Sequence, residues 1–580
     1  MSMKKNILTP LKTGFIGLVF VLSNAFATNY YVDASGGNDN NSGTAETQAW
    51  KTLNRVNESS FAPGDKILFK RGEIWKGRLK VSSSGIAGNP IVYSAYGSGN
   101  KPIIRDIAQQ DLSWSSYDTN IWRAPIKHKL RRLWEGKTEL HRAYILDLFK
   151  DIGPHFRFGC KNGYVYLYKT SKPLSSDYSF YKFGSAIYLS GKNYITFDNL
   201  DAQGGETCFF ADSCKYITVT NCNIGKDAFV GLEIDGKSQG SSAHNKIIHN
   251  TLDSHWTFDD TYAYVGRNSD SRGCEDGIHI THYANDIEIA NNTLKDWGHS
   301  HIYIYDAGSN GLYNIKVHHN YFSTENADYG KGFDVLGSVH QIEFAYNHFY
   351  KVTGASEFDG HDNSFHHNLM DHTKHYGIRG HSGKTGYAIT SNNGTNNVYN
   401  NIIESNIFAY SDSEGISISA YSSKGYKSHD ITIKNNILYK NGDNSITGID
   451  TPSLSIWNSQ YLSNLTIENN LIVHAGSSRM IRYNNTTFSN ISAFNNADKV
   501  NGFKIANNID SDPKFVSTTT YLLQSGSPAS SYGIDTSLIG PTDGVKPTTP
   551  AVEPTTPTTG PTTPAVEATG AFIMDRSGLH

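Results

Sequence analysis

Three stretches in the middle of the chain share one pattern: Ile287-Glu-Ile-Ala-Asn-Asn292, Ile315-Lys-Val-His-His-Asn320 and Ile342-Glu-Phe-Ala-Tyr-Asn347. In each stretch apolar and polar residues alternate, and an Asn follows at a fixed place. An apolar period of two predicts a β-strand, because successive side chains of a strand point to opposite faces. Asn suits the turn that follows, because it tolerates the left-handed backbone region and can hydrogen-bond to its own backbone.

The pattern is an internal repeat. Successive Asn positions from Asn250 to Asn470 differ by 42, 28, 27, 21, 38, 30 and 34 residues. A second strand-like stretch follows each Asn after a short gap, as in Gly277-Ile-His-Ile-Thr and Gly332-Phe-Asp-Val-Leu. A short unit of strands and turns, repeated with insertions, is typical of a parallel β-helix.

The N-terminal segments extend this interpretation. They are Tyr30-Tyr-Val-Asp-Ala-Ser-Gly-Gly-Asn-Asp, Trp50-Lys-Thr-Leu-Asn and Pro63-Gly-Asp-Lys-Ile-Leu-Phe-Lys-Arg-Gly. Together with the repeat they resemble the right-handed parallel β-helix proteins of the pectate-lyase type, a superfamily of secreted carbohydrate-active enzymes. The resemblance covers about residues 28–534 and implies an all-β solenoid whose first coil is capped by a short helix at residues 50–56. Such a cap is needed because an open coil end exposes strand edges.

Composition limits the other classes of function. The 580 residues carry 51 Lys and Arg against 54 Asp and Glu, a net charge of −3, so the charge balance gives no support to nucleic-acid binding. No phosphate-binding glycine motif is present, and we expect no organic cofactor. Residues 1–27 combine a basic start, a short apolar run and Ala25-Phe-Ala27, which predicts a cleaved signal peptide and a secreted or periplasmic protein not held in a membrane.

The remaining chain divides into five parts. We expect the cap and first coils at 28–105, an inserted β-rich subdomain at 106–184 and the main β-helix at 185–540. A Pro/Thr-rich linker at 541–570 and a short tail at 571–580 follow.

The second strand pattern predicts where the chemistry lies. Alternate residues fill the solenoid, so those between them point outward and line up from coil to coil about 4.8 Å apart. One predicted outward row is Glu233, His279, Tyr303, Asp334, Asp359, Arg379, Ser417. The neighbouring row is Asp235, Thr281, Tyr305, Leu336, His361, His381, Ser419. The two rows form a ribbon of ionisable and aromatic side chains.

A long inserted loop flanks the ribbon and contains Trp256, Arg267 and Arg272. Aromatic rings stack on sugars, and Arg forks bind carboxylates or sulfates. We therefore expect the substrate to be a polymer, an acidic polysaccharide, bound by a monomeric protein. The predicted substrate-binding residues are His279, Tyr305, Glu233, Trp256, Arg267 and Arg272.

The preferred reaction is β-elimination on a uronic acid by a polysaccharide lyase. It requires neutralisation of the substrate carboxylate, a base and an acid. The resemblance to pectate lyases implies that Asp334, Glu357 and Asp359 bind Ca²⁺ and that Arg379 acts as the base. His361, His381 or Tyr303 would complete the proton transfers.

Two alternatives stay open. Asp334, Asp359 and Gly380-His-Ser-Gly follow one another in an order similar to that of polygalacturonases, which implies an inverting glycoside hydrolase. The other alternative is a non-catalytic carbohydrate-binding or adhesin solenoid, whose ribbon should consist mainly of Thr, Asn and aromatic residues.

Overall fold

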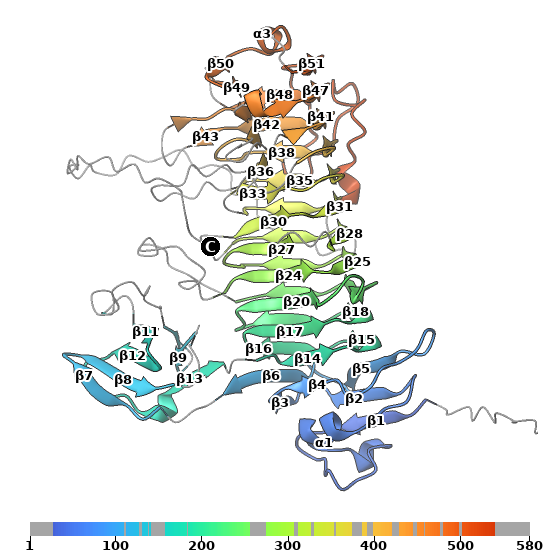
Figure 1. The fold of residues 1–580 in the computed structure, drawn as a ribbon, viewed down its shortest axis with the longest axis vertical. Helices are drawn as coiled ribbons and strands as arrows, with labels where there is room; N and C mark the ends of the chain where they lie inside the picture. The colour runs from blue at the N-terminus through green and yellow to red at the C-terminus, as the bar shows by residue number, and fades with distance from the viewer. Residues whose placement is uncertain are drawn as a thin grey trace, which may run out of the picture. The chain divides into compact units, whose positions relative to one another are not determined.

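The protein folds as a right-handed parallel β-helix, as predicted (Figure 1). The computed structural model describes residues 27–539 except 109–111, 127–129, 131, 137, 141–152, 154–156, 182–183, 256–273, 307–310, 326–329, 353–354, 374–385, 391–397, 420–427, 445–448, 458, 476–478 and 498–500. Each coil contributes one strand to each of three long sheets. Among the described residues, no helix is long and apolar enough to cross a membrane.

The first sheet is parallel throughout. Its strands, in order, are β1 (Asn29–Val32), β2 (Lys66–Lys70), β5 (Ile91–Tyr96), β15 (Asn193–Asp198), β18 (Lys215–Thr220), β21 (Ser242–Ala243), β25 (Ala284–Ala290), β28 (Tyr313–His318), β31 (His340–Ala345), β34 (Ser364–His366), β37 (Ile402–Glu404), β41 (Thr432–Lys434), β47 (Thr466–Glu468) and β51 (Lys504–Ala506). A further strand, β22 (Lys246–Ile248), pairs with β18 and β25.

The second sheet begins with antiparallel strands from the insertion and continues as a parallel sheet. Its strands, in order, are β10 (Thr138–Glu139), β9 (Trp134–Glu135), β13 (Tyr178–Tyr181), β6 (Ile103–Ala108), β16 (Asp201–Gly204), β19 (Asn223–Lys226), β23 (Thr251–Asp253), β26 (Thr293–Lys295), β29 (Tyr321–Ser323), β32 (His348–Tyr350), β35 (Leu369–Asp371), β38 (Ile407–Ala409), β42 (Ile437–Asn441) and β48 (Leu471–His474). Strand β3 (Ile74–Lys76) also pairs with β6.

The third sheet follows the second in every coil. Its strands, in order, are β4 (Leu79–Lys80), β14 (Ile187–Ser190), β17 (Thr207–Asp212), β20 (Val230–Gly236), β24 (Asp276–His282), β27 (Ser300–Asp306), β30 (Lys331–Gly337), β33 (Ala355–Phe358), β36 (Gly386–Thr390), β39 (Ile416–Ser419), β45 (Leu454–Trp457), β49 (Ile481–Tyr483) and β50 (Thr486–Phe488). Two short pairs, β40 (Ser428–His429) with β46 (Leu462–Ser463) and β43 (Asp443–Asn444) with β44 (Ile449–Asp450), complete the solenoid.

Short helices lie near both ends of the solenoid (Figure 1). The first, α1 (Leu53–Glu58), starts where the Thr52 side chain accepts a hydrogen bond from the Arg55 amide, and it buries Leu53 and Val56 against the first coils. The predicted cap therefore exists, with its helical turns beginning slightly later than expected. The second helix, α3 (Ile491–Asn495), ends the stack, and its last residue exchanges hydrogen bonds with Asn508 of the final coil.

The repeated Asn residues form a ladder inside the corner between the first and second sheets. The amide nitrogen and the side chain of Asn320 both donate to Asn347 Oδ1, at 3.0 Å each, and Asn347 in turn donates to Asn368. Each ladder Asn also donates to a backbone carbonyl, as Asn347 does to Val317. The left-handed position is the residue before the ladder Asn, which can be His319 (φ 55°) or Tyr346 (φ 56°). The ladder Asn is thus selected for its amide, and the backbone freedom that we expected of it belongs to its neighbour.

Loss of one ladder amide is expected to destabilise the whole solenoid. Asn347→Ala removes the acceptor of the Asn320 backbone amide and the Asn347 donor to the Val317 carbonyl, which should lower the free energy of unfolding by about 2–4 kcal/mol. Urea denaturation measures this change. The exposed Asn40 offers a matched control, and Asn40→Ala should stay within about 0.5 kcal/mol of wild type. Equal stability of both variants would contradict the role given to the ladder.

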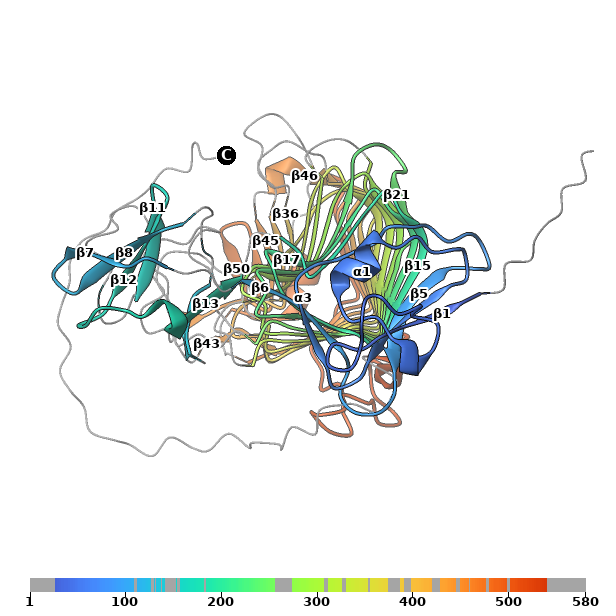
Figure 2. The same cartoon turned by 90° about the horizontal axis from the view of Figure 1, so that it is seen from below.

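An insertion between β6 and β14 forms a subdomain with its own sheet and its own core. Its four strands are β7 (Ser115–Asp118), β8 (Ile121–Pro125), β11 (Phe158–Lys161) and β12 (Tyr164–Tyr168), paired antiparallel in the order β11-β12-β8-β7. A cluster of apolar side chains separate from the solenoid core lies on one face of this sheet. Figure 2 shows these strands beside the solenoid, outside its three sheets.

Candidate active site

The outward side of the third sheet carries a row of ionisable side chains on five successive strands. The strand registers place Glu233, His279, Tyr303, Asp334 and Glu357 side by side in that order. The residues on either side of them in each strand point into the solenoid and are buried, as predicted: Leu232, Ile234, Ile278, Ile280, Ile302, Ile304, Phe333, Val335 and Phe358. A row of this kind is not needed for the core, which the inward residues fill.

Beyond Asp334 the row differs from the prediction. Asp334 pairs with Glu357, and Phe358 pairs with Val335, so Asp359 lies past the end of the strand and is buried. The next two places in the row belong to Ala388 and Ser417. The place in the row that the sequence assigned to Arg379 is taken by Ala388, and Arg379 itself lies outside the described residues.

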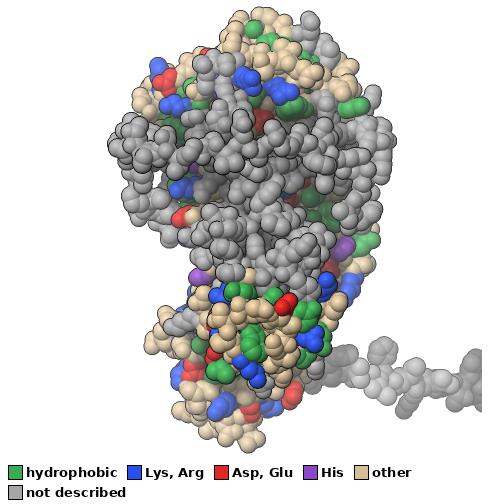
Figure 3. All heavy atoms as spheres, turned by 90° about the vertical axis from the view of Figure 1, so that its left-hand side faces the viewer, with side chains coloured by type: hydrophobic (Ala, Val, Ile, Leu, Met, Phe, Trp, Pro, Cys, Tyr) green, Lys and Arg blue, Asp and Glu red, His purple; other side chains and the backbone are tan. Residues whose placement is uncertain are grey.

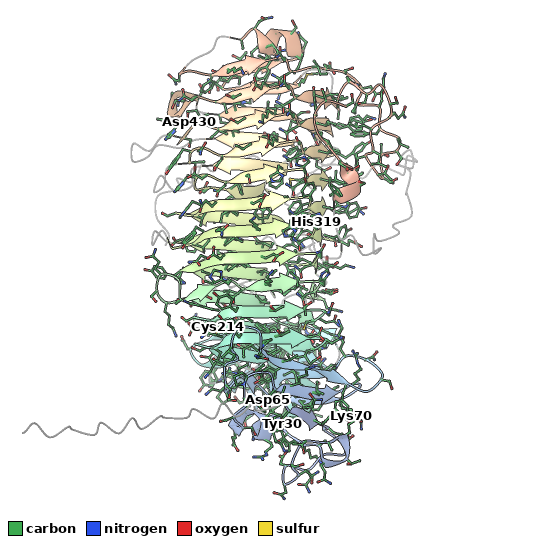
Figure 4. All side chains as sticks on the ribbon, turned by 90° about the vertical axis from the view of Figure 1, so that its right-hand side faces the viewer. Tyr30, Asp65, Lys70, Cys214, His319 and Asp430 are labelled. Carbon is green, nitrogen blue, oxygen red and sulfur yellow. The ribbon has the colours of Figure 1, made fainter. Side chains whose placement is uncertain are left out.

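His361 belongs to the other side of the coil. It bridges to His340 and Tyr399 at the start of the first-sheet strands and does not follow Leu336 on the third sheet. There its ring stacks on Tyr399 and His340, with centroids 4.5 and 5.0 Å apart. Gly360 permits the change of direction, because its backbone has a φ of 82° and a Cβ at this position would clash with the Val339 carbonyl. In Figure 4, Asp430 marks this edge of the first sheet and His319 marks the opposite edge.

A network of ionisable side chains surrounds Asp334. Lys331 Nζ lies 2.9 Å from Asp334 Oδ1 and 3.6 Å from Glu357 Oε1, so one ammonium contacts both carboxylates. Ser300 Oγ donates to Asp334 Oδ2 at 2.7 Å. Behind them His299 lies between two carboxylates, with Nδ1 3.0 Å from Asp276 Oδ1 and Nε2 3.4 Å from Asp334 Oδ2.

Burial makes this network costly for folding. The Asp334 side chain is fully buried, that of Lys331 is 13% exposed and that of Glu357 is 26% exposed. Burial raises the pKa of Asp334, and the Lys331 ammonium and His299 oppose the rise. Paired charges removed from water seldom add stability, and on the outside of a solenoid they are a mark of a functional site.

At the other end of the row, the pKa values of Glu233 and His279 are also shifted. Burial raises the pKa of Glu233 to about 7, and the carboxylates of Asp235 and Asp276 add to the rise, although a hydrogen bond from Thr207 opposes it. Burial lowers the pKa of His279, so its imidazole is neutral at neutral pH. His279 Nε2 is buried without a hydrogen-bond partner.

Tyr303 lies between His279 and the side chains around Asp334 and contacts both groups. Its ring centroid lies 4.8 Å from that of His279 and 5.4 Å from that of His299. Burial, followed by the charges of Asp276 and Asp334, raises the pKa of its phenol. Tyr303 therefore keeps its proton at neutral pH.

The Glu233 shift predicts a measurable pH dependence of stability. The unfolded chain loses this proton near pH 4.3, whereas the folded protein keeps it until about pH 7, so ionisation of Glu233 lowers stability between these values by about 3–4 kcal/mol. Glu233→Gln cannot ionise and can still accept from Thr207. Differential scanning fluorimetry should show the variant melting several degrees above wild type at pH 8. Near pH 4 the variant and the wild type should melt at the same temperature. Glu58→Gln, at an exposed position, is the control and should show no pH-dependent difference.

Two of the three predicted calcium ligands, Asp334 and Glu357, lie side by side, and the calcium site stays a prediction. Lys331 already lies between Asp334 and Glu357, and its charge would repel a divalent cation there. Asp359 lies beyond the end of the strand. Among the described residues, the group whose donor atoms lie within 4.8 Å of one another is Glu275, Asp276 and His299.

Several site residues were not anticipated from the sequence: Asp276, His299, Ser300 and Lys331. They lie at or just before the first residues of third-sheet strands, where a turn and a strand meet. A repeated signal does mark them, since an ionisable residue precedes the Gly of Gly277-Ile and of Gly332-Phe. Of the predicted substrate-binding residues, Tyr305 is 38% exposed beside Tyr303, while Trp256, Arg267 and Arg272, like His381, lie outside the described residues.

The inserted subdomain docks next to this site. Arg132 Nη1 donates to the carbonyls of Ala228 and Ser254, at 3.2 and 3.4 Å. Trp134 packs on Phe229 and Val230, and the Phe229 carbonyl accepts from the Glu275 amide at 2.7 Å. The insertion therefore contacts the turn that leads into β20, one of the strands of the site.

Comparison with known proteins supports the right-handed β-helix fold. A family model described as "Right handed beta helix region" matches residues 185–349. A lacto-N-biosidase of Bifidobacterium longum is 36% identical over 101 residues, which are 16% of this chain and 6% of that protein's length.

Among solved structures, a mannuronic acid-specific polysaccharide family 6 lyase from human gut microbiota is 11% identical, with a TM-score of 0.41 and 84% of this chain and 92% of that one covered. A GH136 lacto-N-biosidase from Eubacterium ramulus is 13% identical, with a TM-score of 0.34 and coverages of 78% and 68%. At these identities the likeness extends to the fold alone. A lyase and a glycoside hydrolase both stand among the similar structures.

Proposed function

We propose that this protein is a glycoside hydrolase that cleaves a polysaccharide on the outward face of the third sheet, with Asp334 and Glu357 as its catalytic carboxyl groups. One observation carries the proposal: the two residues are in register on neighbouring strands and share the Lys331 ammonium. Export across the cytoplasmic membrane and action as a monomer are part of the same proposal.

The spacing favours retention of configuration. Neighbouring strands lie about 4.8 Å apart. This is nearer to the separation of about 5–5.5 Å in retaining glycosidases than to the about 6.5–9.5 Å in inverting ones. We therefore propose Asp334 and Glu357 in place of the inverting pair Asp334 and Asp359 that the sequence offered as an alternative.

The donors around Asp334 assign the roles. Lys331 and Ser300 hold this carboxylate as a hydrogen-bond acceptor, which suits a nucleophile. Asp334 attacks the anomeric carbon while the more exposed Glu357 gives its proton to the glycosidic oxygen, so the C–O bond to the leaving sugar breaks and a glycosyl ester forms. Glu357 then takes a proton from water, the water oxygen attacks the same carbon, and Asp334 leaves as the carboxylate.

Charge favours hydrolysis over elimination. The carboxyl groups of the site are those of Glu233, Asp235, Glu275, Asp276, Asp334 and Glu357, and the lysine among them is Lys331. This excess of carboxyl groups over lysine stabilises the positive charge of an oxocarbenium-like transition state. Elimination on a uronate develops negative charge and needs free cations instead.

A polysaccharide lyase is the second candidate, favoured by the contact between His279 and Tyr303. The neutral imidazole with a free Nε2 is suited to accept the C5 proton of a uronic acid, and the protonated Tyr303 is suited to assist the leaving oxygen. In this version Arg379, Arg267 or Arg272 would neutralise the substrate carboxylate.

One experiment separates the candidates. The protein is incubated with a panel of neutral and acidic polysaccharides, and reducing ends and the absorbance of unsaturated products are followed together. We expect reducing ends to rise without absorbance, and proton NMR of the first product to show the configuration of the cleaved bond. A parallel rise in absorbance would identify a lyase, and no change in either signal would leave a binding protein.

A further inference from the structure

The inserted subdomain has a second sheet face that its own core does not use. Ala124, Val165 and Leu167 cover the inner face and belong to the apolar cluster of the subdomain. The opposite face carries Tyr117, Arg123, Tyr164 and Tyr166, with Arg123 and Tyr166 side by side in register. Figure 3 shows the side of the insertion that faces away from the solenoid, where hydrophobic, basic and acidic side chains are interspersed.

Arg123 lies between two tyrosine rings on this face. Its Cζ is 5.1 Å from the Tyr117 ring centroid and 4.9 Å from that of Tyr164. Tyr117 also meets Tyr166 edge to face, with centroids 5.2 Å apart, and is 41% exposed. Tyr166 is buried, and Gly159 is its neighbour on β11. The rings thereby hold the guanidinium in one orientation.

The charge of Arg123 is not matched by a carboxylate among the described residues. Its Nε is buried without a hydrogen-bond partner. Other cations of the same subdomain are satisfied, since Arg157 and Lys169 both bind Glu135. A buried guanidinium donor without an acceptor costs free energy, which is recovered when a ligand supplies the acceptor.

We propose that this tyrosine–arginine face, defined by Tyr117, Arg123, Tyr164 and Tyr166, binds an anionic glycan. The planar fork of Arg123 takes a carboxylate or a sulfate group in two parallel hydrogen bonds. The exposed Tyr117 ring stacks against a sugar. The two residues before Tyr117 in β7 are serines and not apolar residues, as expected for a surface that binds a polar ligand and not a protein partner.

The position of the insertion links this face to the proposed hydrolase. The subdomain is fixed to the turn before β20 through Arg132 and Trp134, so a polymer held on the insertion is kept close to the cleavage site. Binding at this face is a property of the insertion and does not require that the proposed reaction take place.

Affinity electrophoresis of the full chain tests the proposal. The Glu357→Gln background prevents turnover, and the probes are polygalacturonate, dextran sulfate and neutral dextran. Arg123→Ala should weaken binding of the anionic probe at least about tenfold. Lys172→Ala removes the same charge from an exposed position of the subdomain and should leave binding unchanged. Tyr117→Ser, at an exposed ring, is the second variant, should Arg123→Ala not fold, and should also weaken binding.

The outcomes are distinct. Binding of polygalacturonate alone identifies a carboxylated glycan, and binding of dextran sulfate alone a sulfated one. The proposal is overturned if dextran binds equally well, if Arg123→Ala and Tyr117→Ser bind as the parent does, or if Lys172→Ala weakens binding as much as Arg123→Ala. Loss of binding in the Arg123 variant together with an inactive wild-type protein would reject the hydrolase and leave the binding face.

Discussion

Replacing Glu357 by Gln should lower kcat on the order of 10³-fold while the fold remains intact, because general acid–base catalysis contributes about 10²–10⁴-fold. The side chain is 26% exposed, and Gln can fill the same space, so the melting temperature should change little. The rate is measured by reducing-end release from the polysaccharide that the panel identifies. Glu343→Gln, a glutamate on the outward face of the first sheet, serves as the matched control and should retain full activity.

Two further measurements make the role of Glu357 specific. An aryl glycoside with a good leaving group needs no proton donor, so Glu357→Gln should form the glycosyl ester from it at nearly the normal rate. Azide needs no base to attack that ester and should restore turnover in part. Asp334→Asn should be inactive with every substrate and without response to azide. A Glu357→Gln variant that keeps more than about a third of wild-type kcat would place the acid elsewhere in the row.

The fold could be predicted from the sequence because the apolar pattern in the chain matches what the core and the corners of the coils require. The inward positions repeat with period two, and the Asn ladder requires its amide at one corner of each coil. Both signals are local and recur, so the insertions between coils do not obscure them.

The site was less predictable, because register between coils is not a local property. Matching Phe358-Asp359 to Phe333-Asp334 is a slip of two residues from the observed pairing of Phe358 with Val335. A slip of one residue would place apolar side chains outside, but a slip of two preserves the inward and outward faces. Hydrophobic periodicity therefore could not distinguish Glu357 from Asp359 as the partner of Asp334.

His299 and Lys331 illustrate a second limit. They lie at turns between the second and third sheets, where strand periodicity has not begun. Their role depends on contacts between coils 23 to 34 residues apart, such as that of Ser300 with Asp334. Only the three-dimensional stacking of the coils brings these groups together.

Lys331→Met should destabilise the protein strongly at neutral pH. Without the ammonium, two carboxylates face each other on neighbouring strands, and one of them is fully buried. Breaking a buried pair by removing one partner lowers the free energy of unfolding by about 3–5 kcal/mol. Lys316→Met is the control, because its partner Glu343 lies 3.8 Å away and both side chains are exposed, and an exposed pair contributes about 0–1 kcal/mol.

The pH dependence of the Lys331→Met variant shows whether electrostatics is the cause. Loss of the cation raises the pKa of Asp334 further above its unfolded value, so the folded variant binds a proton that the unfolded chain releases. Its stability relative to wild type should therefore be lowest at pH 7–8 and recover as the pH falls toward 4, where the carboxyl groups are protonated in both states. A packing defect would instead give a loss independent of pH. Glu357→Gln added to Lys331→Met removes one of the opposing charges, so the double variant should be more stable at pH 8 than Lys331→Met alone. If it is not, the carboxylates of Asp334 and Glu357 do not repel each other, and the pairing on which the proposed reaction rests is wrong.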